Sequence, residues 1–485
     1  MGFVTGAEMR ALEEAAFRRG ASAESLMDLA GEGIAQRLVA LFPRPGRCIA
    51  FIGKGNNGGD AWVALRHLRA AGWRIEVRPA YPEIEWGVLP RRKARELGAD
   101  TGPAIDGGGP LLVLDGLLGI GAKGPPRSPL RERVAEIAGL RERHGAVVAA
   151  LDLPSGMDAD SGEGEAVTAD LTLTIGVPKR GLATEAGIPR AGRIVLVPLD
   201  ALPEPEGGST RLFCPEFFPG LLAPRPHDFH KGRAGRLGIL SGSPGMTGAA
   251  VLCAGAALRA GAGLVTLHVE RDFLPALAAA MPPEVMVRVS DDPVAEAFAA
   301  GHDAIVAGPG CGGVSEGWRR SLLAALAGPG PRLVLDADAL NLLAAAGRHD
   351  LLRPDRLITP HPGEFRRLAP DLADGGRVEA AAAFVERHPC ALLLKGARTL
   401  VAAPGQAVRV NPTGRAGMAS GGQGDVLAGV AGALLAQGLD TADAGALAAW
   451  LCGRAAERVE GPFAPAGATL AMLGGALDDW RGRRR

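Results

Sequence analysis

The sequence predicts an α/β protein of two domains, each built on a parallel sheet with helices on both faces. Apolar runs of about four to seven residues alternate with helical segments along most of the chain, which is typical of strands buried on both faces. A segment rich in Pro and Gly divides the chain near its middle. The length of 485 residues and the hydrophobic content of 47% are sufficient for two separate cores.

The predicted first domain covers residues 1–201. It opens with two helices, around residues 8–20 and 24–42. A further helix is expected over residues 60–71, directly after the first strand. The strands are expected within the runs RCIAFIG, RIEVRPA, PLLVLDGL, AVVAALDLP, DLTLTIG and RIVLVPL.

Residues 202–226 are the predicted linker, because they are crowded with Pro and Gly and follow neither the helical nor the strand period. The predicted second domain covers residues 227–485, with a small-residue helix around 248–260 and another helix after Gly424. Its strands are expected within RLGILSG, LVTLHV, DAIVAGPG, RLVLDAD, RLITPHP, ALLLKG and TLVAA. In such folds the loops at the carboxyl ends of the strands are the default binding sites.

The charge balance and the termini restrict the class of protein. Lys plus Arg and Asp plus Glu both number 53, so nothing indicates a nucleic-acid partner. The first twenty residues are too charged for a signal peptide, and no apolar run is long enough to predict a membrane span. The six cysteines lie far apart and fit a reducing compartment. We therefore expect a cytoplasmic homo-oligomer with small-molecule partners and no membrane partner.

The segment GKGNNGGD, residues 53–60, follows the first strand and precedes a helix. Glycines let the backbone turn sharply and approach a ligand, and a helix N-terminus offers unpaired N–H groups to an anion. A plain turn between strand and helix would need only the glycines. Asn56, Asn57 and Asp60 add side-chain ligands, so the segment indicates a binding loop.

Two further loops begin with an aspartate at the end of a strand, Asp115 and Asp152. An Asx turn could explain either loop alone, but three loops that meet at one sheet edge favour a site. Asn57, Asp115 and Ser155 offer hard oxygen ligands of low total charge. Such a set suits a weakly held monovalent cation better than zinc.

The segment NPTGRAGMASGGQGDVLAGVAGALL, residues 411–435, carries the strongest motif. Glycines precede Asp425 at the start of a helix, where successive N–H groups can bind a transferring phosphoryl group. Asp425 can accept the proton of a hydroxyl that attacks phosphorus. The alternative is a glycine turn that ends in an Asp N-cap. The length of the loop and the strand-end segments FHKGRAGRLGILSGSPGMTGAA, AGPGCG, VLDADALNLL, ITPHPGEF and LLLKGARTLV favour the catalytic interpretation.

The segments VTGAEMRALEEAAFRRGASAESLMDLAG, GKGNNGGDAWVALRHL, LDGLLGIG and LDLPSGMDADSG resemble the NAD(P)H-hydrate epimerase family over essentially all of residues 1–200. The resemblance implies a Rossmann-like three-layer sandwich with potassium held by Asn57, Asp115 and Ser155. Lys123 and the two prolines after it depart from the shorter segment expected there. The residues implied to contact the hydrated nucleotide are Asn57, Gly58, Gly59, Asp60, Ala61, Ile120, Gly121, Ala122, Lys123, Gly124, Pro125, Pro126 and Asp152.

In the second domain, ITPHPGEF together with NPTGRAGMASGGQGD resembles the ribokinase-like ADP-dependent NAD(P)H-hydrate dehydratase family, across about residues 230–475. The resemblance implies a ribokinase-like α/β domain that uses ADP and Mg2+. The residues implied to face the hydrate are Ala249, Gly310, His361 and Asp425. Those implied to hold the adenine nucleotide are Lys395, Gly396, Ala397, Arg398, Thr399 and Gly424.

Both resemblances together imply a bifunctional enzyme that repairs hydrated NADH and NADPH. The first domain would interconvert the R and S hydrates, with Asp152 as the candidate acid/base. The second would phosphorylate the S hydrate from ADP, with Asp425 as the base, and loss of phosphate would restore the reduced nicotinamide. Two alternatives stay open: a ribokinase-like kinase for a small alcohol such as a vitamin precursor, fused to a nucleotide-binding module, and a first domain that binds without catalysis.

The chain contains only six lysines, so their positions are informative. Five of them lie in the candidate loops or close beside them: Lys54, Lys123, Lys179, Lys231 and Lys395. The sixth, Lys93, belongs to RRKARELG, which we expect to be a solvated helix face. An ammonium group suits phosphates as a compact point charge.

Overall fold

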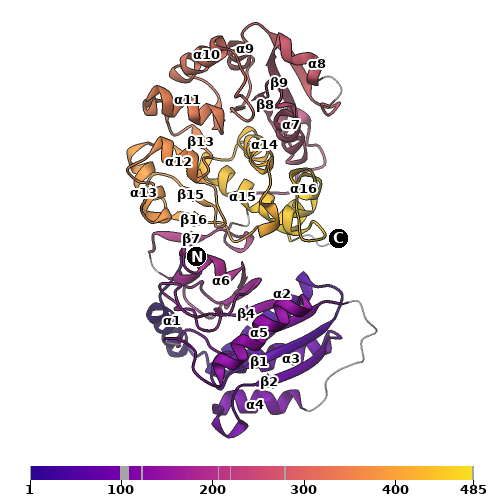
Figure 1. Ribbon diagram of the computed structural model, residues 1–485, viewed down its shortest axis with the longest axis vertical. Coiled ribbons are helices and arrows are strands. Elements are labelled where there is room, and N and C mark those ends of the chain that lie inside the picture. The colour runs from indigo at the N-terminus through magenta and orange to yellow at the C-terminus, as the bar shows by residue number, and fades with distance from the viewer. Residues whose placement is uncertain are drawn as a thin grey trace. The chain divides into compact units, whose positions relative to one another are not determined.

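The computed structural model describes residues 2–98, 109–121, 124–205, 207–218, 220–277 and 280–482. Contacts divide the chain into two compact units, Met1–Gly208 and Ser209–Arg485 (Figure 1). Both units are α/β with largely parallel sheets, so the predicted fold class is confirmed. Within the described ranges, none of the helices has the length and apolar character needed to cross a bilayer.

The described part of unit 1 forms a parallel six-stranded sheet in the order β2-β1-β3-β4-β5-β6. Helices α2 and α3 pack against each other on one face, and α5 packs on β3 and β4. The strands are β1 (Arg47–Ile52), β2 (Arg74–Pro79), β3 (Leu111–Gly116), β4 (Val147–Leu151), β5 (Leu171–Ile175) and β6 (Arg193–Val197). The helices are α1 (Gly6–Arg18), α2 (Ala23–Leu41), α3 (Asn56–Ala70), α4 (Val88–Leu97), α5 (Leu130–His144) and α6 (Ile188–Ala191).

The direction of chain progression across this sheet reverses at β1, because β2 lies on one side of β1 and β3 on the other. The loops after β1 and β3 therefore diverge at the carboxyl edge and leave a crevice, which is where ligands bind in open parallel sheets. The glycine loop and Asp115 both lie at this reversal.

Helix α3 begins at Asn56, four residues before the predicted start at Asp60. Gly53 and Gly55 therefore precede the helix, whereas Gly58 and Gly59 lie in its first turns. Their small size is needed for packing: a Cβ on Gly58 would lie 2.3 Å from the carbonyl oxygen of Gly53, and one on Gly59 would lie 2.4 Å from Met27. This close approach offsets the poor helix propensity of glycine.

Unit 2 contains a ten-stranded sheet within its described residues, in the order β10-β9-β8-β11-β12-β13-β14-β15-β16-β7. Neighbouring strands are parallel except that β15 runs antiparallel to β14 and β16. The strands are β7 (Thr210–Leu212), β8 (Arg236–Leu240), β9 (Leu264–Glu270), β10 (Met286–Ser290), β11 (Ala304–Ala307), β12 (Arg332–Leu335), β13 (Arg356–Ile358), β14 (Ala391–Leu394), β15 (Leu400–Ala402) and β16 (Val408–Val410).

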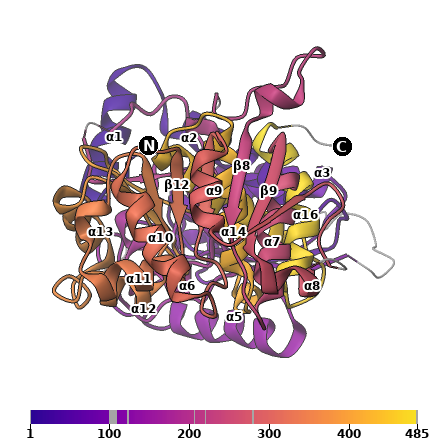
Figure 2. The same cartoon turned by 90° about the horizontal axis from the view of Figure 1, so that it is seen from above.

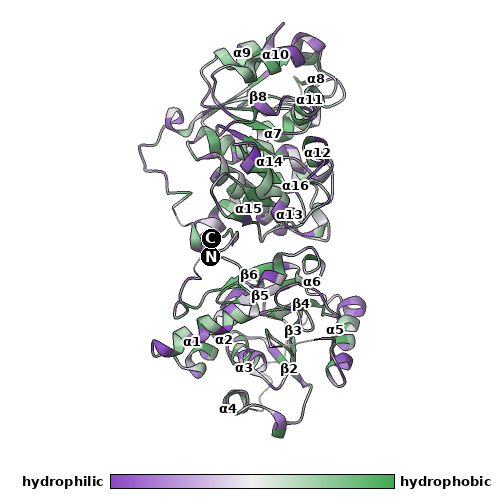
Figure 3. Cartoon of the chain, turned by 90° about the vertical axis from the view of Figure 1, so that its left-hand side faces the viewer, coloured by the Kyte–Doolittle hydropathy of each residue, from purple (hydrophilic) through white to green (hydrophobic). Residues whose placement is uncertain are grey.

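The helices of unit 2 form one layer on each face of the sheet (Figures 1 and 2). One layer contains α7 (Thr247–Arg259), α14 (Gln423–Ala436), α15 (Thr441–Glu457) and α16 (Ala466–Trp480). The opposite layer contains α9 (Pro293–Ala299), α10 (Glu316–Ala327), α11 (Asp338–Ala346), α12 (Pro362–Leu368) and α13 (Arg377–Arg387), and the short α8 (Leu274–Leu277) follows β9. Helix α14 is buried continuously from Val426 to Ala436, and its apolar character is visible in Figure 3.

The predicted linker, residues 202–226, is not irregular throughout. Its residues 210–212 form β7, which pairs with β16 at the edge of the second sheet. The next residue, Phe213, is 1% exposed and stacks on Trp480 with ring centroids 5.3 Å apart. A three-residue strand shows no period in the sequence, so only its partner in space identifies it.

Candidate active sites

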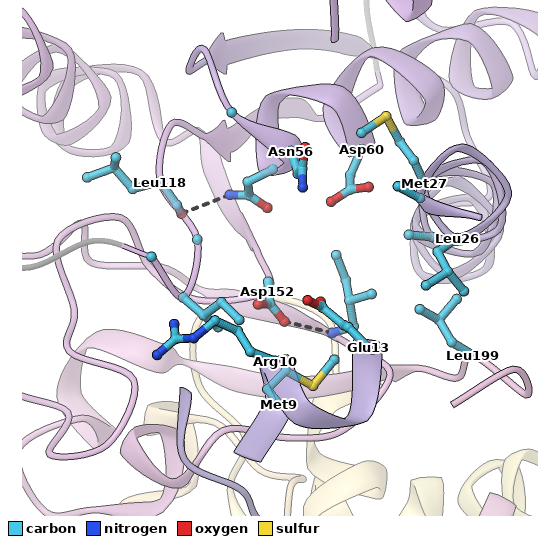
Figure 4. A pocket seen from close by; sticks show the side chains of 18 of the residues that line it. Met9, Arg10, Glu13, Leu26, Met27, Asn56, Asp60, Leu118, Asp152 and Leu199 are labelled. Carbon is cyan, nitrogen blue, oxygen red and sulfur yellow. Dashed lines mark hydrogen bonds between the residues drawn. The ribbon is translucent and has the colours of Figure 1, made fainter. Parts of the chain in front are cut away.

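Unit 1 contains a cavity of about 510 Å³ between its N-terminal helices and the carboxyl edge of the sheet (Figure 4). Its apolar lining comes from α1, α2 and the segment after β6: Met9, Leu26, Met27, Leu199 and Leu202. Its charged and polar lining includes Glu13, Asn57, Asp60, Asp152 and Lys179. An apolar cavity with a few convergent polar groups is the usual form of a small-molecule site.

Asp152 lies directly after β4 and is held by a buried cation. Its carboxylate accepts hydrogen bonds from Lys179 Nζ and, at 3.1 Å, from the backbone N–H of Ile175. Lys179 is 1% exposed and also donates to the carbonyl oxygen of Ile175 at 2.8 Å. Asp152 adopts a φ of 66°, a conformation that costs energy in a residue with a side chain. The ion pair and these hydrogen bonds together hold this carboxylate toward the cavity.

The N-terminal segment helps to build this site. Val4 forms a parallel bridge with Lys179, with hydrogen bonds from the Val4 N–H to the Pro178 carbonyl and from the Arg180 N–H to the Val4 carbonyl. Thr5 then caps α1 in a capping box with Glu8. The bridge thereby places α1, with its cavity-lining residues, beside the sheet edge.

Asp60 projects from the second turn of α3 into the same cavity (Figure 4). Burial raises the pKa of Asp60 well above its usual value, and the negative charges of Asp152 and Glu13 raise it further, while Lys179 opposes the shift. Burial also raises the pKa of Glu13. The cavity therefore contains one carboxylate with a bonded cation and two carboxyl groups in surroundings that favour the protonated form.

The predicted cation ligands converge behind the cavity. The Ser155 hydroxyl donates to Asp115 at 2.5 Å, and the Ser155 N–H donates to the other oxygen of Asp115 at 2.8 Å. Asn57 donates to the Leu118 carbonyl oxygen at 2.8 Å, whereas its own Oδ1 is buried and has no hydrogen-bond donor. Burial raises the pKa of Asp115 to about 6. Leu118 links the three residues, because its N–H donates to the Ser155 hydroxyl at 2.9 Å and its carbonyl accepts from Asn57. An unpartnered amide oxygen and a buried carboxyl group in one loop cluster fit a cation with oxygen ligands.

In unit 2, an ion pair lies at the start of the helix that carries Asp425. Lys395, after β14, bonds Asp336, after β12, at 2.7 Å and lies 3.8 Å from Glu364. A Cβ on Gly424 would be 3.6 Å from both Asp336 and Lys395, so α14 begins directly beside the pair. Burial raises the pKa of Asp425 to about 6; the charge of Asp336 adds to the shift and that of Lys395 opposes it.

The loops after β8 and β11 join this cluster at the point where the strand order reverses. Gly310 has a φ of 66°, and a Cβ there would lie 2.6 Å from that of Ala249. A Cβ on Gly308 would lie 1.9 Å from the Asp336 carbonyl oxygen, so the loops after β11 and β12 are in close contact. Gly422 packs against Leu252 of α7, the helix that carries Ala249.

Comparisons with known proteins identify both units. Residues 23–181 match the family model described as YjeF-related protein N-terminus, and residues 237–473 match the one described as NAD(P)H-hydrate dehydratase. A bifunctional NAD(P)H-hydrate repair enzyme of Coxiella burnetii is 35% identical to this chain over 93% of both proteins. The enzyme of the same name from Escherichia coli is 34% identical over 94% of this chain and 89% of its own.

The chain belongs to the bifunctional NAD(P)H-hydrate repair enzyme family. The resemblance recognised in the sequence is thus confirmed. A solved ribokinase-like protein from Enterococcus faecalis covers 57% of this chain and 99% of its own, with a TM-score of 0.51 at 23% identity. This likeness confirms the ribokinase-like fold of unit 2.

The cavity of unit 1 is lined by some, but not all, of the residues predicted to bind the hydrated nucleotide. Asn57, Asp60, Ile120, Gly121 and Asp152 line it. Three others, Gly58, Gly59 and Ala61, face the packed side of α3, and Ala61 is 0% exposed. Gly124, Pro125 and Pro126 are not among the lining residues, and Ala122 and Lys123 lie outside the described residues.

The predicted nucleotide-binding segment of unit 2, Lys395 to Thr399, forms the turn between β14 and β15. The Thr399 hydroxyl donates to the Gly396 carbonyl oxygen at 3.1 Å, which closes the turn. Gly396 and Ala397 are exposed, whereas Arg398 is 3% exposed and directed into the unit. Burial lowers the pKa of Arg398 to about 10.

His361 is the N-cap of α12 in the repair-enzyme chain. Its Nδ1 accepts the Gly363 N–H at 3.0 Å, while its backbone N–H donates to Glu364 at 2.8 Å. The side chain is half exposed, and its Nε2 lies 3.5 Å from Glu364. The ring is therefore fixed in orientation and still accessible.

Sequence reasoning did not assign site roles to Lys179, Glu13, Asp336 or Glu364. The scarcity of lysine was the available signal, because Lys179 and Lys395 are the two lysines that bond the site aspartates. The prediction that Lys93 lies on a solvated face is wrong. Lys93 is 4% exposed and forms ion pairs with Glu24, Asp28 and Glu96 at 3.1, 2.8 and 3.1 Å.

Proposed function

We propose that this chain repairs hydrated NADH and NADPH in two steps, one in each unit. Unit 1 interconverts the R and S hydrates, and unit 2 uses ADP to dehydrate the S hydrate. The observation that carries the proposal is that both halves align with bifunctional relatives while each retains a carboxylate cluster at the reversal point of its sheet. Spontaneous hydration yields both epimers, so a dehydratase that takes one of them needs an epimerase.

In unit 1, Asn57, Asp115 and Ser155 would hold potassium. The buried and unpartnered Oδ1 of Asn57 supports this assignment, as does the hydrogen-bonded pair of the Asp115 carboxyl group and the Ser155 hydroxyl. A bound cation would supply positive charge behind the cavity. Lys54 and the N-terminus of α3 lie at the cavity lining, where they would bind phosphate groups of the nucleotide.

In unit 2, Asp425 would accept the proton of the hydrate hydroxyl as that oxygen attacks the terminal phosphorus of ADP. Gly422, with a φ of 88°, is the N-cap of α14, and the first N–H groups of this helix would bind the transferred group. The turn at residues 395–399 would hold the nucleotide. Phosphate is a better leaving group than hydroxide, and its departure restores the reduced ring.

Magnesium is expected with the nucleotide. The described residues contain no cluster of three His, Cys, Asp or Glu side chains suited to a metal ion. Mg2+ commonly binds substrate phosphates with few protein ligands, so ADP would bring it to the site. We also propose a cytoplasmic location, which the six buried, unpaired cysteines support, and a homo-oligomeric assembly.

The test mixes the full chain with each purified epimer of NADH hydrate, ADP, Mg2+ and K+, and follows the absorbance of the reduced nicotinamide. Recovery from both epimers is expected, with recovery from the S hydrate alone when unit 1 is inactivated by Asp152→Asn. Failure to recover either epimer contradicts the proposal. Phosphorylation of a small alcohol without such recovery would favour the alternative of a vitamin-precursor kinase.

A further inference from the structure

The cavity of unit 1 has carboxyl groups on opposite walls. Asp60 enters from α3, while Asp152 enters from the end of β4, and Figure 4 shows the Asp60 carboxyl group directed across the cavity toward Asp152 and Glu13. The remaining lining near them is largely apolar, with Met27 and Leu26 on one side. A flat ring bound between the walls would have one carboxyl group on each face.

The two carboxyl groups differ in their bonding. Asp152 has a buried lysine and a backbone N–H as donors, both of which stabilise the anion. Among the residues that the structure describes, Asp60 has neither a hydrogen bond nor an ion pair in the cavity. Burial and two neighbouring negative charges raise the pKa of Asp60, which favours its protonated form. The two carboxyl groups therefore face each other in different surroundings, one with hydrogen-bond donors and one without.

The chemistry of the hydrate restricts how its configuration can invert. The carbon that carries the hydroxyl adjoins the ring nitrogen and is not next to a carbonyl group, so its hydrogen is not acidic. The nitrogen lone pair can instead expel the hydroxyl, which leaves as water if an acid protonates it. The planar cation that results can then take up water from the other face.

We propose that Asp60 is the second catalytic residue of the epimerisation, acting on the opposite face of the ring from Asp152. This inference rests on the proposed function of unit 1. Asp60 donates a proton to the departing hydroxyl as the carbon–oxygen bond breaks and the carbon–nitrogen double bond forms. Water then adds to the other face, its electron pair forms the new carbon–oxygen bond, and its proton passes to Asp152.

The proton balance makes the two roles interchangeable. One inversion leaves Asp60 ionised and Asp152 protonated, and in that state Asp152 is the acid and Asp60 the base for the opposite epimer. One water leaves and one enters, and no electrons are gained or lost. Of the two aspartates, Lys179 forms an ion pair with Asp152 and not with Asp60. It therefore biases the resting enzyme toward the form in which Asp60 carries the proton.

The test follows the epimer ratio of NADPH hydrate with the full chain in ¹⁸O-labelled water and without ADP, so that unit 2 cannot act. We expect one labelled oxygen per inversion in the first turnovers. Asp60→Asn should lower kcat by about 10²–10⁴-fold, as for loss of a general acid. Its Kd for the hydrate should stay within about threefold, because the side chain keeps its size, and the ADP-dependent dehydration of the S epimer should be unchanged.

Two variants serve as controls. Glu14→Gln changes an exposed carboxylate of α1 outside the cavity and should leave epimerisation unchanged. Glu13→Gln changes the third cavity carboxyl group and should lower kcat far less than Asp60→Asn does. Unchanged epimerisation by Asp60→Asn, a larger loss in Glu13→Gln, or inversion with retention of the original oxygen would each overturn the inference. Inactive wild-type protein would instead contradict the proposed function itself.

Discussion

Replacing Lys395 by Met tests the ion pair at the centre of the unit 2 site. The substitution removes the ammonium group 2.7 Å from Asp336, whose side chain is only 2% exposed. Loss of one partner of a buried pair costs about 3–5 kcal/mol, because the other charge stays buried. Lys395 is 20% exposed, so water can enter in its place, and the Ala337 N–H still donates to Asp336 at 2.9 Å. We therefore expect the lower end of that range, about 3 kcal/mol.

The measurement is amide hydrogen exchange in β12 and β14 of the full chain, since these strands precede the two partners. A loss of about 3 kcal/mol accelerates exchange through global opening by about a hundredfold. The double variant Asp336→Asn/Lys395→Met should recover most of the loss, because it removes the charge that the single variant leaves unpaired on Asp336. Lys231→Met, which removes an exposed ammonium, is the matched control and should change stability by less than about 0.5 kcal/mol. Equal exchange in the single and double variants would refute the reasoning.

Three further predictions concern catalysis, the cation and helix packing. Asp425→Asn should abolish dehydration and preserve epimerisation. Because the pKa of Asp425 is raised to about 6, the kcat/KM of wild-type dehydration should fall as the pH drops through about 6 and the base becomes protonated. A kcat/KM that does not change with pH in this range would contradict the assignment. Asn57→Ala should remove the dependence of epimerisation on K+, measured against sodium buffers, whereas an unchanged dependence would count against the assigned ligands. Gly429→Ala places a Cβ 2.1 Å from the Cys253 carbonyl oxygen, so it should lower the free energy of unfolding by about 1–3 kcal/mol and lower the Tm. The control Gly474→Ala, on α16 with open space around it, should not lower the Tm.

The positions of the site loops could be predicted because they follow from the strands. An apolar run that ends in Asp or Gly marks the carboxyl edge of a parallel sheet, so Asp115 and Asp152 were identified without knowledge of their neighbours. The boundary of α3 could not be identified in this way. Glycine disfavours helices on its own, and only the close packing of Gly58 on Gly53 and of Gly59 on Met27 explains why the helix includes them.

The ion pairs could not be predicted, because their partners are distant in sequence. Lys179 lies 27 residues from Asp152, and Lys395 lies 59 residues from Asp336. Lys93 meets Asp28 across 65 residues, which explains why a helix that looks solvated by its own sequence buries its lysine against α2. Periodicity reports which face of an element is apolar, but it carries no information about the charges of the element packed against it.

Each unit places a buried carboxyl group near a lysine-bonded aspartate, and we propose opposite proton roles for the two buried groups. In the described residues, the two non-glycine residues with positive φ are Asp152 and Ala337, the latter directly after Asp336, so each sheet places strain at its lysine-bonded aspartate. In each unit a second carboxyl group nearby is buried without a cation of its own. Burial raises the pKa of Asp60 well above its usual value, and the charges of Asp152 and Glu13 add to the shift, whereas burial and the charge of Asp336 raise the pKa of Asp425 to about 6. At neutral pH a carboxyl group with a pKa of about 6 is largely ionised, which fits the base role that we propose for Asp425, whereas the larger upward shift of the Asp60 pKa fits the acid role that we propose for Asp60.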